Sequence, residues 1–394
     1  MKKNKNVNTL MIVLGFIAFA SGIWSNYRQL WLQEIGYSIT GISKILSVAL
    51  ICSSIISFII SIFSSKIKVK SIVIMSLIFR CLSLAVLLIV RNDFIIKSCV
   101  LLNIMCSVIF SISFYPLLSF ESRRNSAYRR KMLIEYFAKD IGIVLCGLLL
   151  GVSIGNYIFN YDTCLLISLV ATFISCLFLF TYKSSEDEYR KNISLKKSVK
   201  SIFSEKVNRV FLFNQLVCYI AYGMIFDLMM LILTNYISFD ASFAAVFIIG
   251  CNMLGTIFSF IFSKFSKEYS VALSAFIKYG TRGIIYYFAF FSHNPVVFIF
   301  TIIYAHITSR VLEDKATGCF LTLIDEENQF LFGNMRYFEL TLGEGIGAYL
   351  AGVLLSHSLN SLFLGAAIIT TVQTLIYFYL SKLREEKLAI SKKI

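Results

Sequence analysis

Charged residues, proline and histidine are all scarce in this chain of 394 residues. Only 15% of the residues are charged, whereas a soluble domain carries about a quarter. There are two prolines, Pro116 and Pro295, and three histidines. A chain of this length that needed a watery surface could not be built from so few charges, so an ordinary soluble globular protein is excluded.

Catalytic and metal-binding motifs are missing as well. The ten cysteines are scattered, with no C-x-x-C pair and no His/Cys cluster at metal-ligand spacing. Cysteines placed within apolar runs are typical of small buried hydrophobic residues. The sequence has no phosphate loop, nucleotide motif or Ser/His/Asp arrangement. We therefore expect no enzyme, no metal and no cofactor.

Apolar residues are abundant. They make up 58% of the chain, aromatic residues make up 15%, and the mean hydropathy is +0.77. A transmembrane helix needs about 20 mainly apolar residues. Twelve such segments can be placed, at 8–27, 39–64, 71–90, 95–119, 132–155, 162–182, 209–235, 242–263, 270–291, 295–313, 333–355 and 360–381. The sequence thus predicts an all-α integral membrane protein, and we take the first segment as a helix rather than a signal peptide because no small-x-small cleavage site ends it.

The net charge of +15 could suggest a nucleic-acid partner. However, the Lys and Arg residues lie in alternate short breaks between apolar runs, where a membrane protein carries its cytoplasmic charges. The opposite breaks hold almost no positive charge, apart from Arg28 and Arg91. We therefore predict a multi-pass protein of the cell membrane, surrounded by the lipid bilayer, with both termini in the cytoplasm. We expect no nucleic-acid partner and a monomer.

The chain divides around a polar central run. We predict an N-terminal six-helix bundle at 1–182, a cytoplasmic linker at 183–208, and a C-terminal six-helix bundle with a basic tail at 209–394. Short motifs recur in the two halves in the same order, at offsets of 198 to 205 residues. The pairs are Gly22 and Asn26 with Gly223 and Asp227, Ser76 and Arg80 with Ser274 and Lys278, and Gly142 and Gly147 with Gly347 and Gly352. This order favours a parallel six-plus-six duplication.

Twelve spans, inside termini, a long central loop and a parallel repeat resemble the major facilitator superfamily. The resemblance covers essentially the whole chain and implies a secondary transporter whose cavity is lined by helices one, four, seven and ten. Its motifs are degraded. Ser61 and Ser65 stand where the family's second-to-third loop has Gly and Asp, and no Gly-Pro ends the fifth helix as it does in drug–proton antiporters.

Ionisable and polar residues inside spans are costly, so each is a candidate for function. Asn26 and Tyr27 on the first helix, and Tyr222 and Asp227 on the seventh, are candidate cavity residues. The resemblance places Asn26 and Asp227 opposite one another in the outer half of the cavity. A purely structural contact between the amide and the carboxylate is the alternative.

Further substrate-binding candidates lie on other helices. Tyr115 and Glu121 end the fourth helix and Lys139 opens the fifth, in an order similar to that of oligosaccharide–proton symporters. An ordinary i, i+4 pair of Glu135 with Lys139 is the alternative. On the tenth helix His306 and Arg310 also share a face; here the alternatives are a packed histidine and an arginine that extends towards the cytoplasm.

Two carboxyl groups are the expected sites of proton coupling. Glu344 stands in a glycine-lined part of the eleventh helix, and Asp227 lies on the seventh. A carboxyl in an apolar site can be neutral during one step of a transport cycle and ionised in another. Arg80 and Lys278, which match in the repeat, are expected to tie helix ends to acidic groups.

The leading hypothesis is proton-coupled transport of a small solute, with a lean towards efflux of an amphipathic compound because the helices are rich in Phe and Tyr. The alternative is proton symport of a sugar or nucleoside. A non-transporting membrane sensor is the alternative of another class. The three differ in what deletion of the gene would change.

Overall fold

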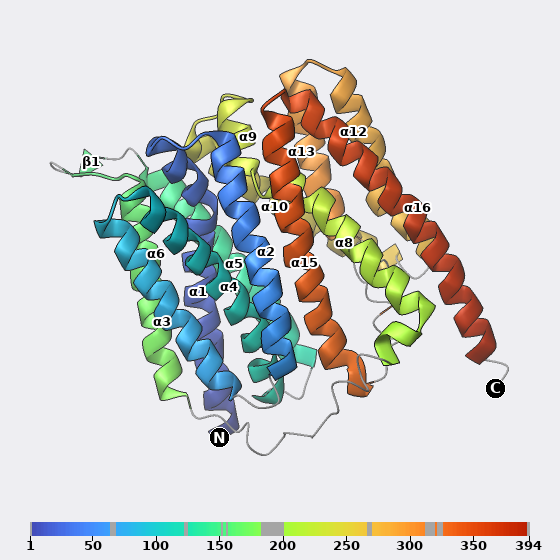
Figure 1. The fold of residues 1–394 in the computed structure, drawn as a ribbon, viewed down its shortest axis with the longest axis horizontal. Helices are drawn as coiled ribbons and strands as arrows, with labels where there is room; N and C mark the ends of the chain where they lie inside the picture. Colours follow the sequence, from blue (N-terminus) through green and yellow to red (C-terminus); the bar gives the residue numbers. More distant parts are fainter. Residues whose placement is uncertain are drawn as a thin grey trace. The chain divides into compact units, whose positions relative to one another are not determined.

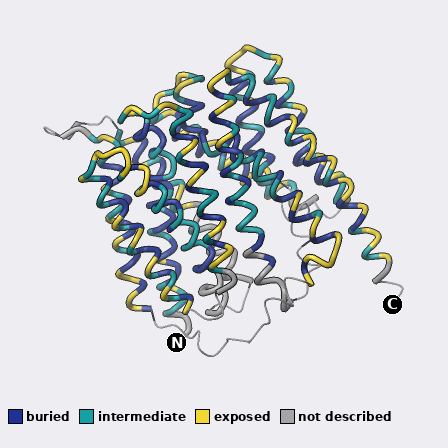
Figure 2. Tube along the Cα trace, in the orientation of Figure 1, coloured by how far each residue is buried: buried dark blue, intermediate teal, exposed yellow. Residues whose placement is uncertain are grey.

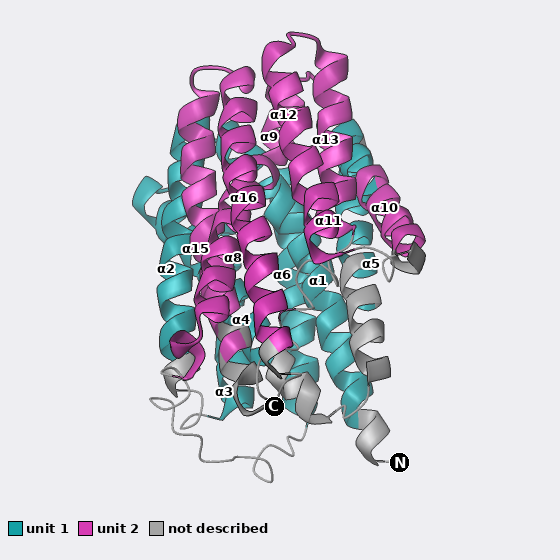
Figure 3. Ribbon diagram, turned by 90° about the vertical axis from the view of Figure 1, so that its right-hand side faces the viewer, with its two compact units in different colours: residues 1–192, 239–249 teal, residues 193–238, 250–394 magenta. Residues whose placement is uncertain are grey.

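The computed structural model describes residues 2–63, 68–121, 125–150, 153–154, 157–182, 201–265, 270–311, 320 and 326–391. The chain splits into two compact units (Figure 3). Unit 1 comprises residues 1–192 and 239–249, and unit 2 comprises residues 193–238 and 250–394. In each unit the helices pack side by side as a bundle (Figure 1). The linker predicted at 183–208 falls mostly outside the described residues.

Unit 1 contains six long helices and a short hairpin. The helices are α1 (Lys2–Glu34), α2 (Ile39–Phe63), α3 (Val69–Ile89), α4 (Asp93–Glu121), α5 (Asn125–Leu149) and α6 (Tyr161–Thr181). Strands β1 (Ser153–Ile154) and β2 (Tyr157–Ile158) are antiparallel, with Ser153 opposite Ile158. Asn160 caps α6, since its side chain accepts a hydrogen bond from the Thr163 backbone N–H.

Unit 2 is also helical. It contains α8 (Lys206–Phe226), α9 (Met229–Asn235), most of α10 (Ala241–Phe265), α11 (Val271–Ala275), the π-helix η3 (Phe276–Gly280), α12 (Thr281–Phe291), α13 (Pro295–Arg310), α15 (Glu326–Leu355) and α16 (Leu359–Ser391). Asn294 caps α13 and Pro295 occupies its first turn, a position where proline's missing N–H costs nothing. Where they are described, the predicted segments are mostly helical; the exceptions include the strand Ser153–Ile154, which falls in the segment 132–155, and the break between α8 and α9 in the segment 209–235.

Each unit has its own apolar core. In unit 1 it joins α1, α3, α4 and α6, with Leu14, Leu77 and Phe114 among its buried residues. In unit 2 it joins α8, α15 and α16, with Phe211 and Tyr377 among them. Burying such side chains stabilises a fold by about 1.5–3 kcal/mol each.

The helices have exposed faces (Figure 2), and many of the exposed residues are large and apolar. Leu82 and Phe180 in unit 1, and Phe288 and Leu375 in unit 2, are each more than half exposed. An apolar surface of this extent indicates contact with lipid. Within the described ranges nine helices are long and apolar enough to cross a membrane, and α13 is a shorter apolar helix of 16 residues. The count of twelve spans and the side on which the termini lie stay predictions.

Candidate functional site

In unit 1, α1 and α5 approach so closely that only glycine fits where they cross. A Cβ added at Gly22 would lie 2.2 Å from the backbone oxygen of Lys139, and one at Gly142 would lie 2.5 Å from that of Phe19. Real Cβ atoms essentially never come within 3.0 Å of another residue. The two glycines therefore hold these helix backbones in contact.

The same crossing occurs in unit 2, between α8 and α15. A Cβ at Gly223 would lie 2.5 Å from the backbone oxygen of Glu344, and one at Gly347 would lie 2.3 Å from that of Ile220. The contacts match residue for residue: the offset is 201 on α1 and α8, and 205 on α5 and α15. The pairs that the sequence repeat brings into register thus meet in the same way in both units.

Side chains at the matched crossings differ in charge. Lys139 in unit 1 corresponds to Glu344 in unit 2, and Asn26 corresponds to Asp227. Lys139 is exposed, whereas Glu344 and Asp227 are partly buried. The Asn26 amide donates a hydrogen bond of 2.8 Å to the backbone oxygen of Gly22 on its own helix. One backbone geometry therefore carries a basic and a neutral side chain in unit 1, and two acids in unit 2.

The backbone also differs at the matched positions of Asn26 and Asp227. In unit 1, α1 runs unbroken past Asn26. In unit 2 the seventh predicted segment, 209–235, is interrupted: α8 ends at Phe226, Asp227 is its C-cap, and α9 begins at Met229. An interrupted membrane helix is a common feature of transporter binding sites, because the helix ends present polar backbone groups.

The predicted cavity tyrosines lie in different surroundings. Tyr27 is fully buried, and its hydroxyl donates to the backbone oxygen of Ile143 on α5 at 2.8 Å. This bond ties α1 to α5. Tyr222 is partly buried and stacks on Phe226, with ring centroids 4.4 Å apart. Tyr27 therefore packs within unit 1. Tyr222 lies on α8, shortly before the helix break at Asp227.

His306 and Arg310 both hold helices together. His306 is buried, its Nδ1 lies 3.1 Å from the backbone oxygen of Ile302, and its ring meets the edge of Phe226. Arg310 donates to the Thr256 hydroxyl at 2.9 Å and to the Asn252 amide oxygen at 3.0 Å, which joins α13 to α10. These contacts support the alternative of a packed histidine. The side chains of Tyr115 and Glu121 lie outside the described part of the chain.

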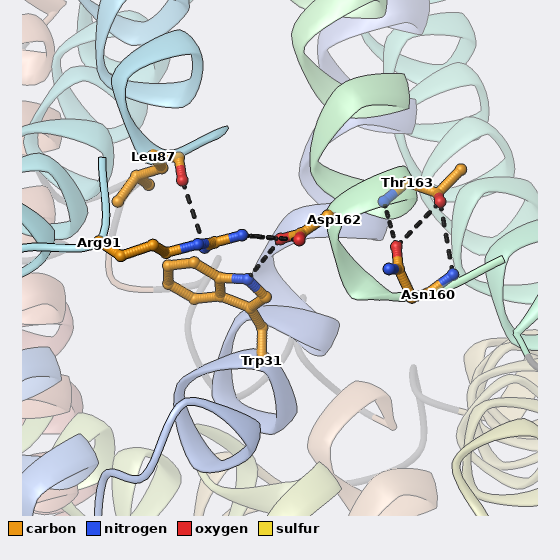
Figure 4. A network of polar contacts seen from close by, with 6 residues as sticks. All are labelled: Trp31, Leu87, Arg91, Asn160, Asp162 and Thr163. Carbon is orange, nitrogen blue, oxygen red and sulfur yellow. Dashed lines mark hydrogen bonds and ion pairs between the residues drawn. The ribbon is translucent and has the colours of Figure 1, made fainter. Parts of the chain in front are cut away.

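A polar network joins α1, α3 and α6 beside the start of α6 (Figure 4). The Arg91 Nη2 lies 2.6 Å from both carboxylate oxygens of Asp162, and the Trp31 indole donates to the same carboxylate at 2.9 Å. Arg91 also lies over the Trp31 ring, 5.2 Å from its centroid. Arg91, an exception to the charge pattern, thus serves as a tie within unit 1.

Unit 2 makes the matched contact without charge. Arg91 and Asp162 correspond, at an offset of 198, to Ala289 and Asn360. The Asn360 amide donates to the backbone oxygens of Phe290 at 2.7 Å and Ser292 at 2.6 Å, where α12 ends. In both units, the second residue of the last long helix therefore holds the end of that unit's third predicted span. This residue is Asp162 on α6 in unit 1 and Asn360 on α16 in unit 2. The repeat motifs had not included these positions.

Arg80 is the clearest departure from expectation. It lies in the middle of α3, is 2% exposed, and its Nη2 donates to the Ser21 hydroxyl at 3.0 Å. Its Nε and Nη1 have no hydrogen-bond partner in the part of the chain that the structure describes. The expectation that Arg80 ties a helix end to an acidic group is wrong for the described residues, because its recorded partner is a serine. Lys278, its match in unit 2, donates to the backbone oxygen of Ser309 at 3.1 Å.

The turn after α1 carries a polar cluster outside the predicted spans. The Tyr37 hydroxyl donates to Asp93, which also pairs with Lys97 at 2.7 Å. Partial burial, together with the hydrogen bond to Asp93, raises the pKa of Tyr37 to about 12. This cluster lies at the surface and holds the α1–α2 turn against the start of α4.

The sequence matches no family model and no curated protein. Solved structures do match, over nearly the whole chain. A mutant of the nucleoside transporter NupG is 12% identical, with 95% of this chain and 99% of that chain covered and a TM-score of 0.76. A bacterial homologue of the human lysosomal transporter Spinster is 10% identical, with 97% of each covered and a TM-score of 0.75. A structure of proton-dependent oligopeptide transporters is 14% identical, with 98% and 99% covered and a TM-score of 0.69.

These likenesses show the fold. The chain has the same fold as these transporters, which agrees with the fold that the sequence resemblance implied. Together with the apolar helices, this makes it a multi-pass membrane protein. All the structures named are transporters by their descriptions. At 10–14% identity the likeness concerns the fold.

Proposed function

We propose that this chain is a secondary active transporter that moves a small solute across the cell membrane by alternating access, with protons as the coupling ion. The duplicated glycine crossings support this, because parallel repeats of helices are the usual construction of such carriers. The described transporters of the same fold support it as well. No ATP-binding motif occurs in the sequence, so an ion gradient is the energy source that the chain's own residues can use.

The observation that carries the proposal is the helix interruption at Asp227. A titratable carboxyl group occupies the C-cap of α8, at a position where the matched helix α1 is continuous and neutral. A carboxyl in a partly buried site can exchange a proton as its access to water changes. Asp227 is therefore the first candidate for coupling, and Glu344, at the crossing of α15 with α8, is the second.

We propose export of an amphipathic compound as the direction and substrate type, and uptake of a sugar or nucleoside as the second candidate. The engagement of His306 and Arg310 in packing weighs against the uptake reading, in which they would bind the solute. The nucleoside transporter among the structures of the same fold favours the uptake reading. A sensor that does not transport is the remaining candidate.

A deletion strain separates the three readings. Under the export reading, deletion increases sensitivity to lipophilic toxic compounds, and a chromosomal Asp227→Asn variant reproduces that sensitivity at normal protein abundance. Under the uptake reading, deletion abolishes accumulation of one labelled solute and leaves tolerance unchanged. If the strain shows neither change, and purified protein in vesicles with an imposed pH gradient moves no solute of the screen, transport is contradicted.

A further inference from the structure

The buried arginine of unit 1 lies at the centre of its helix. Arg80 has roughly 15 Å of α3 on each side of it, at a rise of about 1.5 Å per residue. That depth corresponds to the middle of a bilayer whose hydrocarbon core is about 30 Å thick. A lipid headgroup at the membrane surface is too far away to reach it, and a charged side chain at this depth is costly enough to indicate a function.

Most hydrogen-bonding capacity of Arg80 is unused. A guanidinium has five N–H groups. The unpartnered Nε and Nη1 atoms carry three of them, although both atoms are buried. The group stays charged, because arginine is not deprotonated in proteins. Buried donors without acceptors are rare in folded proteins, and a buried cation without an anion is rarer.

A second buried donor lies on α1, near the residue that contacts Arg80. On α1, Ser21 contacts Arg80 and Trp31 contacts Arg91. Trp24 lies between these two contacts, three residues after Ser21 and hence on the same face. Its side chain is 1% exposed, and its indole N–H has no acceptor among the described residues. The helical spacing from Ser21 therefore puts the Trp24 indole on the side of α1 that Arg80 contacts.

The fourth helix closes this region with polar but uncharged groups. Asn103 on α4 is buried and donates to the Ser83 hydroxyl, one turn from Arg80, at 3.2 Å. No carboxylate among the described residues pairs with Arg80, so nothing recorded in unit 1 neutralises it.

We propose that Arg80, assisted by the Trp24 indole N–H and the Ser21 hydroxyl, binds an oxyanion group, carboxylate or phosphate, of the transported solute. An oxyanion supplies the acceptors and the negative charge that these groups lack, and charge-assisted bonds to guanidinium are among the strongest in proteins. The inference rests on the proposed function only in making the oxyanion part of a transported solute. It narrows the amphipathic compounds considered above to organic anions.

The binding experiment uses the full-length protein in an uncharged maltoside detergent, which removes lipid phosphate as a source of the anion. The melting temperature is recorded in low-salt chloride buffer against increasing benzoate, with benzamide as the neutral isostere and inorganic phosphate as the second oxyanion. We expect saturable stabilisation by benzoate or by phosphate, and none by benzamide. A wild-type protein that responds to neither oxyanion overturns the proposal.

Variants then assign the effect to Arg80. Without benzoate, Arg80→Met should melt higher than the wild type, because an uncompensated buried charge has been replaced by an apolar side chain, and it should not respond to benzoate. Arg80→Lys keeps the charge and loses the fork of N–H groups, so its half-saturating benzoate concentration should rise roughly tenfold. Trp24→Phe should weaken binding less. Arg91→Gln, which alters a paired arginine just after the end of α3, should respond as the wild type does.

Each contrary result is decisive. A lower melting temperature for Arg80→Met in the absence of anion makes the arginine structural and contradicts the site. A benzoate response that survives in Arg80→Met, or is unchanged in Arg80→Lys, places binding elsewhere. A protein that binds benzoate through Arg80 but moves no solute keeps the site and loses the proposed function. A transporter of neutral solutes that is unaffected by Arg80→Met keeps the function and loses the site.

Discussion

The two units share a backbone arrangement and differ in the charges placed upon it. In both, matched glycines hold two helices in contact, and the second residue of the last long helix secures the end of the third predicted span. Unit 1 uses an ion pair for the second contact and carries Lys139 at the crossing; unit 2 uses an amide and carries Glu344. The two units therefore have the same helix packing at the positions that require glycine. They differ in charge at the matched positions whose side chains are at least partly accessible.

The largest expected effect tests whether the two crossings are equivalent. Gly142→Ala and Gly347→Ala each place a Cβ within 2.5 Å of a backbone oxygen, at Phe19 and Ile220 respectively. Forcing such helices apart costs about 1–3 kcal/mol, and occasionally more. We expect both variants to lower the melting temperature by similar amounts. The control is Gly250→Ala, whose Cβ meets nothing within 4 Å, so it should be neutral or stabilising by up to about 1 kcal/mol. If Gly142→Ala lowered the melting temperature and Gly347→Ala did not, the two helix crossings would not be equivalent.

The next effect compares the two helix-end contacts. Asp162→Ala removes the acceptor of the buried Trp31 indole and the partner of Arg91, whose side chain is 41% exposed. The indole loss costs about 1–3 kcal/mol, whereas the screened ion pair adds about 0.2–1 kcal/mol. Asn360→Ala removes neutral bonds to two backbone oxygens, at about 1 kcal/mol. Added salt should reduce the difference in melting temperature between wild type and Asp162→Ala, and it should leave the difference between wild type and Asn360→Ala unchanged. Equal salt sensitivity in thermal melts would contradict the assignment.

A smaller effect concerns a contact within unit 2. Arg310 and Asn252 join α13 to α10. Asn252→Ala should cost about 1 kcal/mol, because one bond to a charged donor is lost while the bond to Thr256 remains. Solute transport should stay at the wild-type rate. A variant of normal stability that no longer transports would return Arg310 to the list of binding residues.

The smallest expected effect is the pH dependence of stability that comes from Tyr37. The folded state raises the pKa of Tyr37 from 10.0 to about 12, so the neutral phenol is favoured in the folded protein. The stability from this group is fully present below pH 10 and is lost as the pH rises towards about 12. The melting temperatures of wild type and Tyr37→Phe should therefore converge over that interval. A constant difference would show that the phenol does not titrate in the fold as described.

The sequence predicted the positions of the helices better than it predicted the roles of polar residues. The glycine repeat matched Gly22 with Gly223 and Gly142 with Gly347, but the contact of Gly22 with the fifth helix depends on three-dimensional packing and was not predicted. Arg80 was misread because its partner depends on three-dimensional packing: no spacing in the sequence indicates that Ser21 would face it. The break at Asp227 carries no proline or glycine signal, and the residues around it read as one apolar run.

The central claim is that unit 2 carries the coupling acid and unit 1 does not. Solute-driven proton uptake into proteoliposomes containing a pH-sensitive dye, with the solute identified by the deletion screen, tests it most directly. We predict that wild type and Lys139→Gln move protons, whereas Asp227→Asn exchanges solute without moving protons. Proton movement at the wild-type rate in Asp227→Asn would contradict the account.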